Sequence, residues 1–161
     1  MITEIAQQIA AKLRQARRVL LIPGTSLDGD SLGSACALYL YLRKLDIPAI
    51  IFSPVPVHQN FLFLPHAEDI THNETAFENV DTIVVFDAGD LRYAGLAERL
   101  PTMQPRPTVI NIDHHASNEH FGDLNLVITD AAATTEVLYA FFNAINALKE
   151  RFPYERSSAD V

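Results

Sequence analysis

The sequence predicts an α/β fold, namely a three-layer, Rossmann-like domain around a mainly parallel five-stranded sheet. Short apolar runs typical of buried strands alternate along the chain with segments that carry an apolar residue every three or four positions, as helices do. Strands that alternate with helices are joined by right-handed crossovers, which give a mainly parallel sheet covered on both faces. The expected strands are 18–22, 49–52, 82–86, 108–112 and 123–128.

The last of these strands alternates apolar and polar residues, so we expect it at an edge of the sheet. Between the second and third strands, Pro54 and Pro56 indicate a loop, and 61–65 is expected to form a turn or a short 3₁₀ segment.

The expected helices are marked by their spacing and by their ends. In the first, isoleucines and a leucine recur at a spacing near 3.6 residues, with alanines between them. Pro101 ends the third helix, and Thr134 or Thr135 is expected to be the N-cap of the last. The expected helices cover 2–17, 31–44, 93–100 and 134–149.

A chain of 161 residues has the length of one domain, which we place at 1–150. Residues 151–161 combine proline, serine and charge without a period, and we expect them to be a disordered tail. The apolar runs are far shorter than the roughly 18 residues that span a bilayer. The N-terminus has an early acid where a signal peptide needs an apolar core. We therefore expect a cytoplasmic protein without membrane association.

The formal net charge of −8 argues against a long nucleic acid as partner, because such an interface needs several Lys and Arg. The negative net charge does not exclude a small phosphorylated substrate that is held through metal ions. The single cysteine, Cys36, excludes an internal disulfide and a thiolate cluster for zinc. Its apolar helical surroundings indicate a small core residue.

Acidic and imidazole side chains follow three of the expected strands. Strand 108–112 leads directly to Asp113-His114-His115, strand 82–86 leads to Asp87, and strand 18–22 leads through a short loop to Asp28-Gly29-Asp30. The carboxyl ends of parallel strands meet at one edge of the sheet, where open α/β folds bind ligands. Carboxylate oxygen combined with imidazole nitrogen suits Mn²⁺, and suits Mg²⁺ or Fe²⁺ less well. Two such ions, about 3.5–4 Å apart, would let a bridging hydroxide attack phosphorus.

Each of these features also has an ordinary structural explanation. Most Asp-Gly pairs are surface turns, and an acid after a strand is commonly a helix cap. Adjacent histidines at the end of a strand are less common. The occurrence of all three features at strand ends favours a metal site over three independent structural roles.

The same residues resemble the motifs of the DHH phosphoesterase superfamily, named after the triplet that appears here as Asp113-His114-His115. The first motif corresponds to 27–35, the second to 84–90 and the third to 111–123, followed by 133–139. Together with the Phe-Leu-Phe-Leu-Pro segment at 61–65, they most resemble the branch of nanoRNases and 3′-phosphoadenosine-5′-phosphate (pAp) phosphatases. The resemblance covers almost all of the chain from Arg18 to about Tyr139.

The resemblance implies a site with two metal ions, Mn²⁺ or Mg²⁺. In it, Asp28 would bind the first ion and Asp30 the second. Asp87 would bridge both ions, and His114 would complete the coordination of the second.

The resemblance also implies roles around the metals. His115 would face the substrate phosphate as hydrogen-bond donor and electrostatic stabiliser, and Asp113 would accept a hydrogen bond that orients an imidazole. Ser34 and Asn118 would shape the substrate pocket through hydrogen bonds. Arg92 is a candidate phosphate contact. An arginine on the outward, solvent-facing side of a helix without a binding role is an equally good explanation.

Two departures from the family pattern bear on activity. The family usually places a histidine four residues before the first motif aspartate, where this chain has Gly24. The family also has a metal-binding aspartate in a fourth motif and a second, substrate-binding domain, neither of which we find in this sequence. Each metal would then lack one expected ligand, so that one ion or none are alternatives to two. His120 or Asp130 could substitute. On this interpretation the chain is a fragment of a longer protein or a natural remnant.

Three functions are therefore considered. The first is a metal-dependent phosphoesterase, or exonuclease, that hydrolyses short oligoribonucleotides or pAp. The second is a non-catalytic module that binds nucleotide or metal. A manganese-dependent inorganic pyrophosphatase ranks last, because the segment 61–65 and the pattern at 118–123 fit the nucleotide branch better. Self-association through apolar surface is a further expectation.

Overall fold

The structure is a computed structural model and describes residues 2–146. The expected tail at 151–161 and the last part of the expected final helix, at 147–149, lie outside these residues. None of the helices within 2–146 has the length and apolar content needed to cross a membrane.

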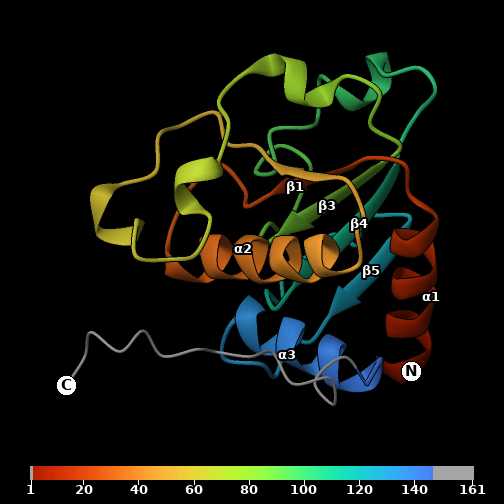
Figure 1. Cartoon of the computed structure of the whole chain (residues 1–161). Helices are drawn as coiled ribbons and strands as arrows, with labels where there is room; N and C mark the ends of the chain where they lie inside the picture. The colour runs from red at the N-terminus through yellow and green to blue at the C-terminus, as the bar shows by residue number, and fades with distance from the viewer. Residues whose placement is uncertain (1, 147–161) are drawn as a thin grey trace.

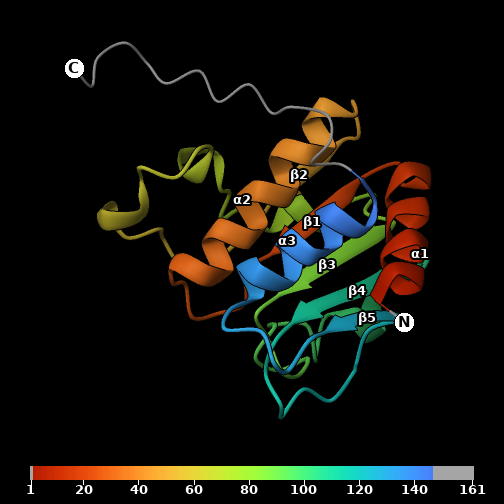
Figure 2. The ribbon, with the colours of Figure 1, turned by 90° about the horizontal axis from the view of Figure 1, so that it is seen from below.

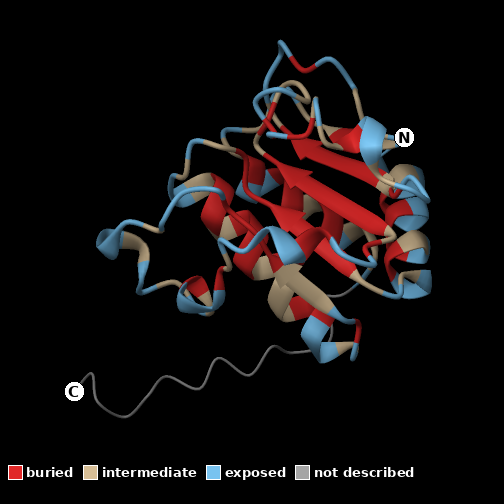
Figure 3. Ribbon diagram, turned by 90° about the horizontal axis from the view of Figure 1, so that it is seen from above, coloured by how far each residue is buried: buried red, intermediate tan, exposed pale blue. Residues whose placement is uncertain are grey.

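Five strands form one sheet in which every pairing is parallel, in the order β2-β1-β3-β4-β5 (Figures 1 and 2). This arrangement confirms the predicted α/β fold, including the edge position of the fifth strand. The central strands are buried, as Figure 3 shows. The strands are β1 (Val19–Ile22), β2 (Ala49–Ile51), β3 (Thr82–Phe86), β4 (Thr108–Asp113) and β5 (Leu124–Val127).

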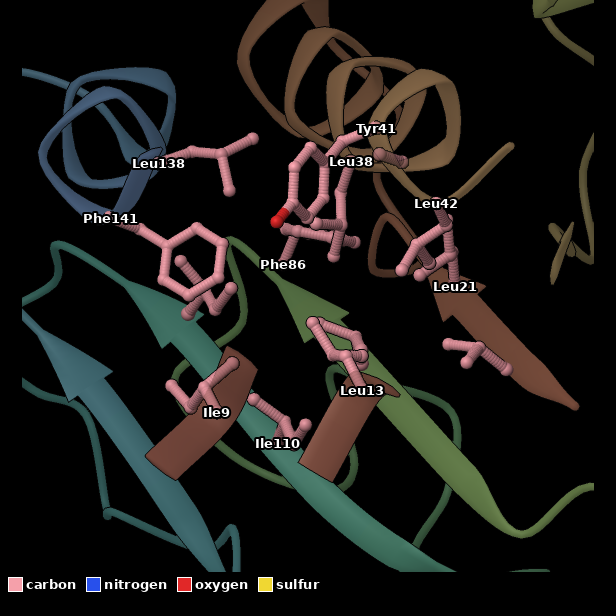
Figure 4. Packing of buried hydrophobic residues seen from close by; sticks show 14 of the residues in the cluster. Ile9, Leu13, Leu21, Leu38, Tyr41, Leu42, Phe86, Ile110, Leu138 and Phe141 are labelled. Carbon is pink, nitrogen blue, oxygen red and sulfur yellow. The ribbon is translucent and has the colours of Figure 1, made fainter. Parts of the chain in front are cut away.

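One face of the sheet is packed against all three α-helices that the structure describes. Phe86 and Ile110 project from β3 and β4 into a core that also contains Ile9 of α1, Leu38 of α2 and Phe141 of α3 (Figure 4). Full burial of an aromatic or branched side chain contributes about 1.5–3 kcal/mol each. The helices are α1 (Ile2–Gln15), α2 (Gly29–Lys44) and α3 (Thr134–Ala144).

The opposite face is covered by 3₁₀ turns and loops in the described part of the chain. A second apolar cluster joins alternate residues of β1 and β3 to Phe52, Phe77, Leu96 and Leu100. The short turns are η1 (Gln59–Phe61), η2 (Ala67–Asp69), η3 (Glu74–Phe77) and η4 (Leu100–Thr102).

The prediction of a helix at 93–100 is wrong. The backbone there forms turns, because Gly95 takes a left-handed φ of 69° that interrupts a helix. The Asp90 carboxylate accepts the backbone N–H groups of Arg92 and Tyr93, both at 2.7 Å, and so fixes a tight turn. Arg92 therefore does not lie on a helix, contrary to the expectation.

Helix starts differ from the expectation in one informative way. α2 begins at Gly29, with Asp28 as its N-cap, slightly before the expected start at Ser31. α3 begins at Thr134, and its N-cap position is Ala133, which has no side-chain acceptor. Thr134 and Thr135 are therefore not the N-cap, and α3 takes its cap from another part of the chain.

The turn before β5 leaves no room for a side chain at Gly122. A Cβ there would lie 2.7 Å from the Leu124 carbonyl oxygen and 3.1 Å from the Asn111 nitrogen, both of which are backbone atoms. We predict that Gly122→Ala lowers the free energy of unfolding by about 2 kcal/mol through overpacking. Urea denaturation measures this difference. Gly89→Ala is the matched control, since its Cβ would meet neighbours no closer than 3.8 Å; equal stability of the two variants would contradict the packing.

Candidate metal centre

The carboxyl edge of the sheet brings together residues from three separate parts of the chain. Asp87 directly follows β3, His114 directly follows β4, and Asp30 lies in the first turn of α2. The His114 Nε2 lies 3.6 Å from Asp87 Oδ1 and 4.0 Å from Asp30 Oδ2. Three of the four residues expected to bind metal therefore converge, as the strand-end pattern predicted.

The orientation of His114 favours a cation between these groups. Its Nδ1 lies 3.1 Å from the Ala131 carbonyl oxygen. A carbonyl oxygen can only accept, so Nδ1 carries the proton and donates it, and the remaining nitrogen Nε2 is left facing the two carboxylates. Separations of 3.6 and 4.0 Å are too long for hydrogen bonds. In the neutral imidazole Nε2 then carries a lone pair, which the two carboxylates repel unless positive charge lies between them, and a metal-binding histidine is commonly anchored in this way.

Asp30 is held in place by the N-terminus of α3. Its Oδ2 accepts the backbone N–H of Thr134 and its Oδ1 accepts that of Thr135, both at 2.7 Å. This carboxylate supplies the cap that Ala133 lacks, and the positive end of the helix dipole favours its negative charge. Each carboxylate oxygen has two acceptor sites, so Asp30 can also bind a cation.

Asp87 adopts a strained backbone conformation in a crowded, negatively charged environment. Its φ is 55°, a left-handed value that is uncommon for residues other than glycine and that is often found at functional sites. Burial raises the pKa of Asp87; the hydrogen bond from Thr134 Oγ1, at 2.8 Å, opposes this, and the charges of Asp30 and Asp28 raise it further. Carboxylates that compete for protons in this way are stabilised by a divalent cation.

Asp28 caps α2 and lies close enough to Asp87 to raise its pKa. Its Oδ1 accepts the backbone N–H groups of Asp30 at 3.0 Å and Ser31 at 2.9 Å. A Cβ at Gly24 would lie 3.8 Å from the Asp87 carbonyl oxygen and 3.6 Å from a ring carbon of Tyr93. Gly24 thus lies next to the cluster but offers no ligand, and its φ of 66° disfavours any larger residue.

A buried hydrogen-bond network fixes His115 beside Asp87 and His114. Asp113 is fully buried and accepts His115 Nδ1 at 2.8 Å, the His114 backbone N–H at 2.7 Å and Asn118 Nδ2 at 2.6 Å. Asn118 in turn donates to the Ala88 carbonyl oxygen at 3.2 Å. Asp113 therefore holds the His115 imidazole through a hydrogen bond. Its hydrogen bond raises the pKa of His115, against the opposing effect of burial.

Ligand-capable atoms of Asp87, His114 and His115 lie within 4.8 Å of one another. These three residues are the most compact group of possible metal ligands in the described chain. The set differs from the expected one, because it includes His115 and leaves Asp28 and Asp30 at its margin as helix caps. Carboxylate and imidazole donors together fit a divalent transition ion.

Other expected site residues lie apart from this cluster. Ser34 is fully buried in α2, and within the described residues its hydroxyl has no hydrogen-bond partner, so no substrate can reach it there. Asn118 is 8% exposed and acts in the network instead of in a pocket wall. Arg92 is exposed on the turn after β3. His120 folds its Nδ1 back to the Asn118 carbonyl oxygen at 3.1 Å, and Asp130 lines a groove beside α1.

Sequence reasoning missed Thr134, whose N–H and hydroxyl hold Asp30 and Asp87 respectively. It also missed the Ala131 carbonyl that orients His114. The run of small residues and threonines before α3 was a signal for a helix start. It gave no indication that the cap would come from a distant motif.

Comparison with known proteins identifies the family of the chain. Residues 18–161 match the model of the DHH family, N-terminal domain. The chain belongs to the DHH family. It is 32% identical over 112 residues to the bifunctional oligoribonuclease and PAP phosphatase NrnA of Thermus thermophilus, a match that spans 69% of this chain and 32% of that protein. The chain thus spans about a third of the length of this curated relative.

The DHH fold is also found in a crystal structure of an exopolyphosphatase-related protein from Bacteroides fragilis. The two superpose with a TM-score of 0.81 at 19% identity, over 91% of this chain and 45% of the other. The DHH family depends on divalent metals, and the donor set at the sheet edge fits such an ion.

We predict opposite effects of Asp87→Asn with and without metal. In the presence of a chelator the variant should melt at the same temperature as the parent or higher, because it loses a repelled charge and asparagine tolerates a positive φ. Mn²⁺ at about 100 times its dissociation constant should stabilise the parent by about 2.7 kcal/mol and the variant much less.

Thermal unfolding with chelator and with Mn²⁺ measures both effects. Asp130→Asn, which removes an exposed carboxylate outside the cluster, is the matched control and should respond to Mn²⁺ like the parent. An equal Mn²⁺ response in the Asp87 variant would show that the ion binds elsewhere.

Proposed function

We propose that this DHH domain, placed at 1–150, carries the hydrolytic site of a divalent-metal-dependent phosphoesterase that acts on short nucleotides, either oligoribonucleotides or pAp. The observation that carries the proposal is the orientation of His114, whose Nε2 faces the Asp87 and Asp30 carboxylates. The similarity to an oligoribonuclease and PAP phosphatase supports the choice of nucleotide substrates.

Different residues at the metal centre would bind the two ions. Asp30, Asp87 and His114 would hold one ion, and Asp28 with Asp87 would hold a second, for which Gly24 supplies no imidazole. Mixed carboxylate and imidazole donors favour Mn²⁺ over Mg²⁺. When bound, such ions polarise the phosphate and provide a hydroxide nucleophile near neutral pH.

The remaining residues position the substrate phosphate. Asp113 holds His115 through Nδ1 and raises its pKa, which favours the protonated ring, and in that form Nε2–H would donate to a phosphate oxygen where negative charge develops. Thr134 and the N-terminus of α3 keep Asp30 and Asp87 fixed, so that the cluster does not reorganise during the reaction.

A second function, the non-catalytic module that binds nucleotide or metal, is favoured by one observation. Gly24 lies beside the Asp87 carbonyl and contributes no ligand where the family usually has histidine. A single bound ion and no turnover would support this alternative. The cytoplasmic location and self-association remain predictions.

We predict Mn²⁺-dependent release of nucleoside monophosphate from a dinucleotide, or of phosphate from pAp. Asp87→Asn should abolish turnover, and His115→Gln should lower kcat about 100-fold because a hydrogen-bond donor to the phosphate is lost. Steady-state assays with inorganic pyrophosphate as competing substrate distinguish the three candidate functions. Turnover that survives in the Asp87 variant or in a chelator would contradict the proposal.

A further inference from the structure

The segment between β2 and β3 exposes the most accessible large apolar side chain in the described chain. Phe63 is 78% exposed and the adjacent Leu62 is 50% exposed. An aromatic ring in water carries an unfavourable hydration cost that burial by a ligand would remove. The exposure therefore requires an explanation.

The exposure of Phe63 does not result from a loose backbone. In the turn η1 and just after it, Phe61 N–H donates to the His58 carbonyl oxygen at 2.9 Å and Leu64 N–H donates to that of Phe61 at 3.0 Å. The side chains of Val57, Phe61 and Leu64 pack against the main core. The segment is thus anchored on one side, and it holds the Phe63 ring on the other.

This segment adjoins the metal centre. A ring carbon of Phe61 lies 3.6 Å from the position of a Cβ on Gly29, the residue between Asp28 and Asp30. Figures 1 and 2 both place the segment beside the N-terminal end of α2, at the carboxyl edge of the sheet. Phe63 is two residues from that contact and lies on the same segment.

The carboxylates and imidazoles of the metal centre can recognise phosphate, whereas a base needs an apolar surface. A flat, exposed aromatic ring suits a nucleobase, because base–aromatic stacking contributes roughly a tenfold to hundredfold gain in affinity per base and tolerates any base. The nearby His58 is exposed, and its Nδ1 accepts the Asn60 N–H at 3.3 Å, which leaves Nε2–H free to donate.

We propose that Phe63 is a stacking platform for a base of the nucleotide whose phosphate lies at the metal centre. The inference rests on the proposed function in that the ligand is a nucleotide, and it deepens that function by naming the residue that recognises the base. Two exposed side chains are a much smaller surface than the roughly 800 Å² per partner of a stable protein interface, which disfavours a second copy of the chain as the occupant.

The chain contains no tryptophan, so Phe63→Trp introduces a single fluorescent probe at the proposed platform. We expect saturable quenching by adenosine monophosphate in Mg²⁺, and none by ribose 5-phosphate, which has the same phosphate and sugar without the base. Tyr139→Trp on α3, at a side chain that is 62% exposed, is the matched control and should not be quenched. Equal quenching by both ligands, or at both positions, would overturn the platform.

A second measurement uses binding affinity. Phe63→Ala should weaken adenosine monophosphate binding about tenfold and leave ribose 5-phosphate binding unchanged, whereas Phe63→Tyr should retain the parent affinity. A change in sedimentation mass in Phe63→Ala would identify the patch as a protein interface and overturn the inference. Ligand binding can be measured without turnover, so the phosphoesterase activity and the stacking role of Phe63 can be refuted independently. Quenching without hydrolysis counts against the phosphoesterase, and hydrolysis without base-dependent quenching counts against the platform.

Discussion

The capping of α3 by Asp30 is the interaction on which the site depends. It joins Asp30 to residues 104 and 105 positions away through two hydrogen bonds of 2.7 Å, and it fixes the start of α3 against the start of α2. Thr134 extends the same link to Asp87 through its hydroxyl. Two helix N-termini, capped by Asp28 and Asp30, thus point at one place on the sheet edge. Their positive ends offset the repulsion among the carboxylates and keep the cluster assembled.

The metal centre contains several features that are usually unfavourable for folding. Asp87 has a positive φ and a raised pKa, and Asp113 is a fully buried carboxylate. The surrounding hydrogen bonds hold both groups in place. Asp113 accepts hydrogen bonds from three donors. One of them, Asn118, is itself held because its side-chain Oδ1 accepts a hydrogen bond from Asn111 Nδ2 at 2.9 Å. Strain of this kind persists where the structure around it is over-determined, and it is typical of functional sites.

The sheet and the place of the site could be predicted because both depend on local sequence. Apolar runs mark buried strands, and the acids and histidines directly after them must lie at the carboxyl edge. The prediction of a helix at 93–100 was wrong because the spacing of apolar residues does not reveal the left-handed turn at Gly95. The cap of α3 was missed because its partner, Asp30, is remote in sequence. The burial of Ser34 followed from the packing of α2, which the motif alone does not specify.

The orientation of His114 is tested most directly by nuclear magnetic resonance of the protein with ¹⁵N-labelled histidine at neutral pH. Stoichiometric Zn²⁺, a diamagnetic ion with affinity for imidazole, should shift the Nε2 resonance of His114 and leave its Nδ1 protonated, with no such shift in Asp87→Asn. Coordination through Nδ1, or a His114 spectrum that Zn²⁺ does not change, would contradict a metal centre built on the Ala131 hydrogen bond.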